Sequence, residues 1–138
     1  MLSNSDLMLV LDTDALIEVE KGNNKVIAQI SKLRKEHPED IAITSAVYAE
    51  FFFGLMSLSE SKKEDALSSV HHYRILEFDK SSAAKFAQLR WRLEKEGESI
   101  PLFDLVTASI ALVNGAIIVT MDKHYERVSG LNMLMLKP

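Results

Sequence analysis

Short apolar runs alternate with segments of helical periodicity along this chain. The first run, Leu7-Met8-Leu9-Val10-Leu11, is continuous rather than alternating. Such a run is typical of a strand that is buried on both faces of a parallel sheet. Further strands are predicted for residues 41–44, 74–78, 116–120 and 131–136.

Apolar residues at helical spacing fill the intervals between these strands. Helices are predicted for residues 14–22, 26–35, 46–55, 60–70, 80–96 and 101–114. Ser45 and Asp79 are predicted as N-caps, and Pro38 is predicted to end the preceding helical pattern. Gly115 is predicted to end its helix in the left-handed conformation. Strands and helices alternate, so we expect an α/β fold with a mainly parallel sheet.

Length and composition suit a soluble globular protein. The 138 residues predict one domain over 1–138, with 47% apolar residues and no long apolar stretch. Cysteine is absent and the N-terminal residues lack the features of a secretory signal, so we expect a cytoplasmic location. The net charge of −4 disfavours a module that binds nucleic acid by phosphate neutralisation alone.

Four acidic residues stand where the pattern otherwise predicts core. Asp12 closes the first strand, Glu50 lies among aromatic residues, Asp104 falls early in a helix, and Asp122 follows the strand at 116–120. A carboxylate at the edge of a core raises the free energy unless a positive charge compensates it. Taken singly, each acid could also be a helix cap, a first-turn acid or a solvated residue.

The predicted topology can bring the four acids together. Ligands of open parallel sheets bind at the carboxyl ends of the strands, where Asp12 and Asp122 are placed. Clustered carboxylates either share protons or bind a hard cation, for which Mg²⁺ or Mn²⁺ fits best. The His and Cys spacings of zinc sites do not occur. Such an ion polarises a phosphoryl oxygen and activates water, which describes a phosphodiesterase.

Four motifs in this order resemble the PIN domain family, and within it the VapC type of toxin ribonuclease. They are Leu11–Ile17, Ala49–Glu50 with Phe53–Gly54, Asp104–Ala111, and Val119–Val128 with Gly130–Leu131. The resemblance covers nearly the whole chain. It implies a three-layer α/β/α fold around a mainly parallel sheet of four to five strands, with the first strand central.

The resemblance also implies an endoribonuclease that uses Mg²⁺ or Mn²⁺. Asp12, Glu50, Asp104 and Asp122 match the acidic quartet that serves as metal ligands and catalytic residues in the family. A homodimer and a small VapB-type antitoxin are the implied protein partners, RNA is the substrate, and no membrane is involved. Exposed aromatic side chains among Phe51, Phe52, Phe53 and Trp91 would suit such interfaces.

Some residues depart from the family pattern or allow two interpretations. Asp14 stands where Asn or Ser is common, and it either binds the metal or orders its loop. Tyr125 replaces a common Phe and is expected to fill the same apolar slot with its hydroxyl in water. Thr120 either orients Asp122 or simply completes its strand. His124 has the features of a solvated loop residue, with RNA contact as the alternative.

Three alternative functions remain open. Asp12-Thr13-Asp14 resembles the Asp-x-Asp of haloacid-dehalogenase-type phosphatases, although Leu16 departs from that motif. A signalling receiver domain has acids after its first strand and a late Lys-Pro, but here no chain follows Lys137-Pro138 to form the last helix. A PIN-like domain that binds RNA or a partner without catalysis is the third.

Overall fold

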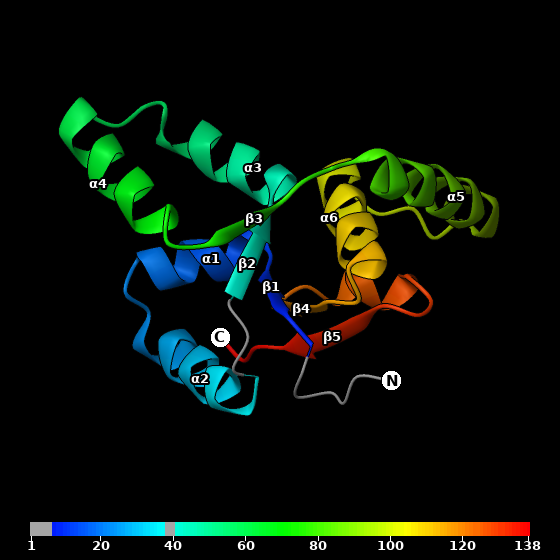
Figure 1. The fold of residues 1–138 in the computed structure, drawn as a ribbon, viewed down its shortest axis with the longest axis horizontal. Helices are drawn as coiled ribbons and strands as arrows, with labels where there is room; N and C mark the ends of the chain where they lie inside the picture. The colour runs from blue at the N-terminus through cyan, green and yellow to red at the C-terminus, as the bar shows by residue number, and fades with distance from the viewer. Residues whose placement is uncertain (1–6, 38–40) are drawn as a thin grey trace.

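A computed structural model describes residues 7–37 and 41–138 of the chain. Its five strands form one parallel sheet of order β3-β2-β1-β4-β5, so the first strand is central, as expected (Figure 1). The strands are β1 (Leu9–Leu11), β2 (Ile41–Thr44), β3 (Arg74–Leu76), β4 (Ile117–Thr120) and β5 (Asn132–Met135). The three inner strands β1, β2 and β4 are buried along their whole length, which explains why their sequences are almost entirely apolar.

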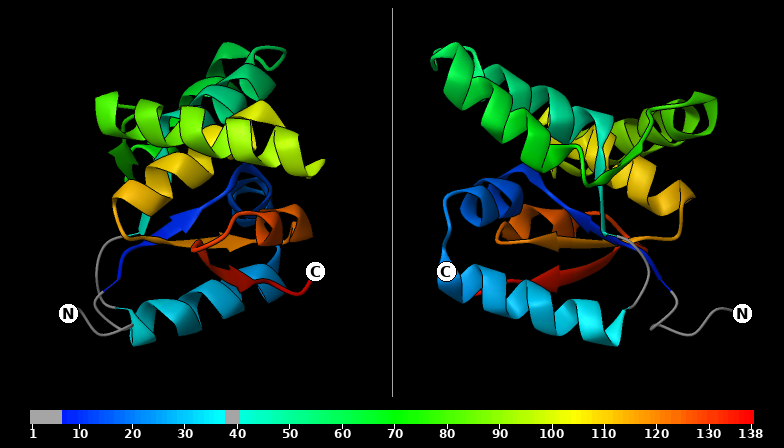
Figure 2. Two further views of the ribbon diagram at one scale, coloured as in Figure 1. Left: turned by 90° about the vertical axis from the view of Figure 1, so that its right-hand side faces the viewer. Right: turned by 60° about the vertical axis from the view of Figure 1, so that its left-hand side comes forward.

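In the described residues, six α-helices and one 3₁₀-helix connect the strands and cover the sheet on both sides (Figures 1 and 2). They are α1 (Thr13–Glu20), α2 (Asn24–Glu36), α3 (Ser45–Leu55), α4 (Glu60–Val70), α5 (Lys80–Glu96), α6 (Leu102–Val113) and η2 (Lys123–Arg127). The result is the three-layer α/β/α arrangement that the sequence predicted. Among the described residues, no helix combines the length and the apolar character that crossing a membrane requires.

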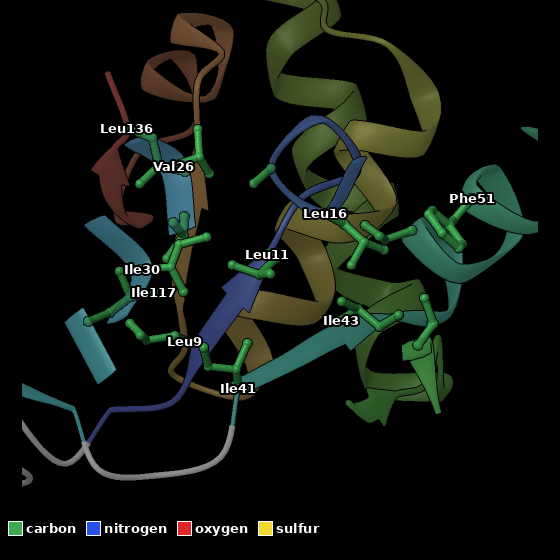
Figure 3. Close-up of a cluster of buried hydrophobic side chains, with 14 of the residues drawn as sticks. Leu9, Leu11, Leu16, Val26, Ile30, Ile41, Ile43, Phe51, Ile117 and Leu136 are labelled. Atoms are coloured by element: carbon green, nitrogen blue, oxygen red, sulfur yellow. The ribbon is translucent and has the colours of Figure 1, made fainter. Parts of the chain in front are cut away.

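The first core lies between the sheet and the helices α1 to α4. Leu9, Leu11 and Ile43 point from the strands into this layer, where they pack against Leu16 and Phe51 (Figure 3). These side chains are at most 5% exposed. Because side chains alternate along a strand, the intervening residues must point to the opposite face.

The second core lies between that opposite face and the helices α5 and α6. Val10, Ala42 and Ile118 contribute from the strands, and Ala108 and Ala111 of α6 are completely buried against them. Small side chains let a helix approach a sheet and a neighbouring helix closely. The apolar and small residues of α6 therefore fix the position of the helix that carries Asp104.

Helix ends follow the predicted chemistry with one exception. Asp79 caps α5 by accepting a hydrogen bond from the Ser82 amide, and Gly115 has a φ of 61° after α6. The prediction for Ser45 was wrong, because Thr44 caps α3 by accepting from the Val47 amide at 3.1 Å. Ser45 is already helical, and its hydroxyl accepts from Phe78 instead. The break predicted at Pro38 lies outside the described residues.

Candidate metal centre

Two neighbouring strands end side by side at the site. Leu11 of β1 is in register with Val119 of β4, and the Asp12 amide continues the ladder by donating to the Val119 carbonyl at 3.2 Å. Asp12 follows β1 directly, and Asp122 follows β4 after one residue. The predicted meeting of these two segments at one edge of the sheet is thus confirmed.

All the acids singled out from the sequence line a single cleft of about 350 Å³. We call it the acidic cleft; its lining residues are Asp12, Thr13, Asp14, Glu50, Pro101, Leu102, Phe103, Asp104 and Asp122. Helix α3 brings Glu50 to the cleft, and the first turn of α6 brings Asp104. Within the part of the chain that the structure describes, the lining has five acids and no Lys or Arg.

Asp12 is the most buried acid of the acidic cleft, with 4% of its surface exposed. One carboxylate oxygen caps α1 by accepting from the Ala15 amide at 3.0 Å, and the other accepts from the Thr120 hydroxyl. Asp12 is therefore both the N-cap of α1 and a lining residue of the acidic cleft. Burial raises the pKa of Asp12 to about 6, and the charges of Asp14 and Asp104 act in the same direction.

Thr120 connects the two strand ends. Its buried hydroxyl donates to Asp12 and accepts from the Asp122 amide at 2.9 Å. The Thr120 hydroxyl thus orients the chain at Asp122, and Thr120 is also the β-branched last residue of β4. Neither of the two interpretations excludes the other.

Glu50 is held by a contact that the sequence did not reveal. The Thr13 hydroxyl donates to Glu50 Oε1 at 2.7 Å, which ties α3 to the start of α1. Asp14 is exposed at the rim of the same cleft. Asp104 is partly buried, and this burial raises its pKa although the nearby His124 lowers it.

His124 is not the solvated residue that its loop position predicted. Its side chain is 17% exposed, and its two ring nitrogens lie 2.7 Å from Asp104 Oδ2 and 2.7 Å from Asp122 Oδ1. The available sequence signal was its place two residues after Asp122 in a tight 3₁₀ turn. That signal is weak, because the partner Asp104 is distant in sequence.

Tyr125 fills an apolar slot in the second core, as expected, but its hydroxyl does not reach water. The side chain is 1% exposed and the hydroxyl oxygen is buried beside Asp104. Burial raises the pKa of Tyr125, and the charges of Asp104 and Asp12 raise it further. The tyrosine thus stays neutral and packs in the second core behind Asp104.

The residues of the acidic cleft fit a divalent cation. Carboxylate oxygens are the ligands that hard cations such as Mg²⁺ and Mn²⁺ take. Asp12 and Asp104 both have pKa values that burial raises, so their ionised forms lack sufficient compensating charge in the protein itself. A bound cation would supply that charge.

Comparison with known proteins identifies the family. A family model described as PIN domain matches residues 9–131. The chain belongs to the PIN domain family. That match spans β1 to β4 and ends just before β5, and it includes the whole acidic cleft.

Individual relatives of this PIN domain protein are similar over most of its length. Ribonuclease VapC2 of Rickettsia felis is 29% identical, over 91% of this chain and 95% of the relative. The tRNA(fMet)-specific endonuclease VapC of Shigella flexneri is 27% identical over 91% and 95%. A crystal structure of VapBC2 from Rickettsia felis bound to a promoter DNA fragment has a similar fold, with a TM-score of 0.84 and 24% identity over 95% and 100%.

Proposed function

We propose that this PIN domain protein is a Mg²⁺- or Mn²⁺-dependent endoribonuclease and the toxin of a VapBC-type toxin-antitoxin pair. The observation that carries the proposal is the acidic cleft, where carboxylates from four separate elements meet at the carboxyl ends of β1 and β4. Relatives of similar length are named as a ribonuclease and a tRNA-specific endonuclease. The haloacid-dehalogenase and receiver alternatives are not favoured, because the match to the PIN domain family covers β1 to β4 and the whole acidic cleft.

Asp12, Glu50, Asp104 and Asp122 are the proposed metal ligands and catalytic residues. When bound, a divalent cation would neutralise phosphodiester charge and promote the ionisation of water. Two hydrogen bonds fix the Asp12 side chain for this task. The Ala15 amide donates to one carboxylate oxygen, and the Thr120 hydroxyl donates to the other. Thr120 serves as an accessory residue, and Asp14 at the rim is a further acid for the cation or its water molecules.

Glu50 is suited to handle the proton of the attacking water. Thr13 donates to one oxygen of Glu50 and so fixes the side chain, while the other oxygen remains able to accept a proton. Water attacks the phosphorus and its proton passes to Glu50. The scissile P–O bond breaks, and the leaving oxygen keeps the electron pair and takes a proton from solvent. The hydrolysis requires no covalent intermediate on the protein.

Apolar side chains beside the acidic cleft suit a protein partner. Phe53 is 79% exposed, Met56 55% and Phe103 52%, and a hollow lined by Ala49, Glu50, Phe53 and Phe103 adjoins the cleft. A VapB-type antitoxin that covers these residues would block access of RNA to the acids. We also propose a cytoplasmic location and a homodimer, and sedimentation of the purified protein would test the homodimer.

The test is cleavage of defined RNAs by the purified protein, with Mg²⁺, with Mn²⁺ and with a chelator. We expect cleavage that needs the metal and falls at least 100-fold in Asp104→Asn, since charge stabilisation and positioning both depend on this acid. Glu60→Gln, an exposed acid on α4, is the matched control and should cleave like wild type.

Two results would count against the proposal. Equal cleavage by wild type and Asp104→Asn would show that the activity is a contaminant. Metal binding without any cleavage over a broad set of RNAs would favour a PIN domain that only binds RNA or a partner.

A further inference from the structure

His124 occupies the space between two of the proposed metal ligands. Its Nδ1 lies 2.7 Å from Asp122 Oδ1 and its Nε2 lies 2.7 Å from Asp104 Oδ2. Its backbone amide donates to the same Asp122 oxygen at 3.2 Å, and its ring lies against Tyr125 at 5.0 Å between centroids. The imidazole is therefore confined at the site by three neighbours.

The donor atoms of this group are compact enough for one ion. One atom each from Asp104, Asp122 and His124 lie within 4.8 Å of one another. Two ligands at metal distances of about 2.0–2.2 Å are at most roughly 4.4 Å apart, so a small side-chain movement suffices. Across the described residues, neither carboxylate has a Lys or Arg partner within ion-pair distance.

We propose that His124 supplies a nitrogen ligand to the divalent cation that Asp104 and Asp122 hold. This inference rests on the proposed metal site and adds a ligand to it. Mg²⁺ takes oxygen ligands almost exclusively, whereas imidazole binds transition metals well. The nitrogen therefore shifts the preference of the site from Mg²⁺ toward Mn²⁺ relative to a site of carboxylates alone.

One ring nitrogen of His124 would bind the metal, and the carboxylate beside the other ring nitrogen would hold the ring in place. A metal-bound histidine commonly donates its other ring N–H to a carboxylate, which fixes the tautomer and the ring orientation. Here the contacts to Asp104 and Asp122 lie on opposite nitrogens, so one nitrogen can turn to the cation while the other keeps a carboxylate partner. The arrangement supplies the ligand and its support together.

The test uses Mn²⁺ alone as the probe and does not depend on activity. Pulsed EPR of Mn²⁺ bound to the wild-type protein should show the ¹⁴N modulation of a directly bound imidazole. His124→Gln should lose this modulation, and calorimetry should show Mn²⁺ binding weakened roughly tenfold with Mg²⁺ binding changed less than about threefold. His71→Gln, an exposed histidine at the end of α4, should behave like wild type.

The outcomes separate this inference from the proposed function. If Mn²⁺ binds in a manner that depends on Asp104 but shows no ¹⁴N modulation in wild type, His124 is not a ligand and the nuclease proposal stands. If Asp104→Asn leaves Mn²⁺ binding unchanged, the metal site itself is wrong and both proposals fail. Because the EPR signal is read on wild type, a folding defect in His124→Gln cannot obscure the result.

Discussion

Asp12 has two tasks that compete energetically. As the cap of α1 it accepts an amide hydrogen bond, which stabilises the fold, but its burial penalises the ionised form. Well below the ordinary pKa of 3.8 the carboxyl is protonated in both the folded and the unfolded protein. Between a pH of about 4 and about 6 the unfolded protein ionises Asp12 while the folded protein keeps the proton, so the folded protein loses stability as the pH rises through this range.

Asp12→Asn should therefore stabilise the protein when metal is removed by a chelator. Asparagine keeps the capping oxygen without the charge, so we expect a gain of about 1–3 kcal/mol in unfolding free energy at pH 7.5. The gain should shrink as the pH falls below about 6 and vanish well below 3.8. Urea unfolding across this pH range measures it, with Asp65→Asn, an exposed acid on α4 outside the acidic cleft, as the control. A gain that is independent of pH would show that burial of the charge is not the cause.

Thr120→Val tests the link between the two strand ends. The variant removes the hydroxyl that donates to Asp12 and accepts from the Asp122 amide, at a fully buried position. Buried donors and acceptors that lose their hydrogen-bond partner lower the stability by about 1–3 kcal/mol. Thr120→Ser keeps the hydroxyl and should therefore retain most of the wild-type stability. Chemical denaturation of both variants provides the measurement. Equal losses in the Val and Ser variants would assign the effect to the methyl group instead.

For single residues, the sequence predicted which acids lie together in the acidic cleft but not how their side chains are held. Asp12 could be predicted because a charged residue directly after a buried apolar run is unusual. The contacts of Thr13 with Glu50 and of His124 with Asp104 join residues distant in sequence. They depend on the packing of α3 and α6, which periodicity alone does not define. The roles of the four acids as ligands stay a prediction.

Helix α6 is the element that positions Asp104. The helix begins after Pro101 without a side-chain cap, and its inner face is buried from Leu105 to Ala111. Thr107 adds a buried hydrogen bond of 2.9 Å to Thr44 at the end of β2. The position of Asp104 in the acidic cleft thus depends on close packing of the following two turns.

Ala108→Leu should displace the helix and with it the ligand. Ala108 is completely buried, and three extra carbon atoms there should cost about 1–3 kcal/mol in stability. We expect Mn²⁺ affinity to fall together with the melting temperature. Val113→Leu, at a partly exposed position near the end of the same helix, is the control. Loss of stability with unchanged Mn²⁺ affinity would mean that this packing does not position Asp104.

Element types were predictable because patterns within each segment are strong. The β-strands have continuous apolar runs, and the α6 helix is bracketed by Pro101 and Gly115. Boundaries were less predictable, as at Ser45, because adjacent Thr44 and Ser45 have nearly equal capping ability. The 3₁₀-helix η2 was not predicted, since a single Tyr among four polar residues gives no periodicity and looks like a loop.

For the whole molecule, metal binding and folding should be linked. Ligands that bind only the folded state stabilise it, by about 2.7 kcal/mol when the ligand is at 100 times its dissociation constant. At such a concentration, Mg²⁺ or Mn²⁺ should raise the melting temperature of wild type by roughly 5–10 °C. Asp104→Asn should show a much smaller increase. The same increase in both proteins would indicate that the metal binds elsewhere.

The topology of the molecule was predictable from the alternation of elements and the motif order, whereas its surfaces were not. Phe51 and Phe53 are two residues apart, yet one is 5% and the other 79% exposed. Only the orientation of α3 against the sheet decides which aromatic ring faces outward. A single domain over residues 1–138 stays a prediction.

The most direct test of a shared metal site is Mn²⁺ affinity in a double-variant cycle. Wild type, Asp12→Asn, Asp104→Asn and the double variant would be freed of metal and titrated by calorimetry. If the two acids hold one ion, each single variant should bind Mn²⁺ at least roughly tenfold more weakly. The double variant should then lose less binding free energy than the two single variants lose together. Unchanged Mn²⁺ affinity in both single variants would contradict the account.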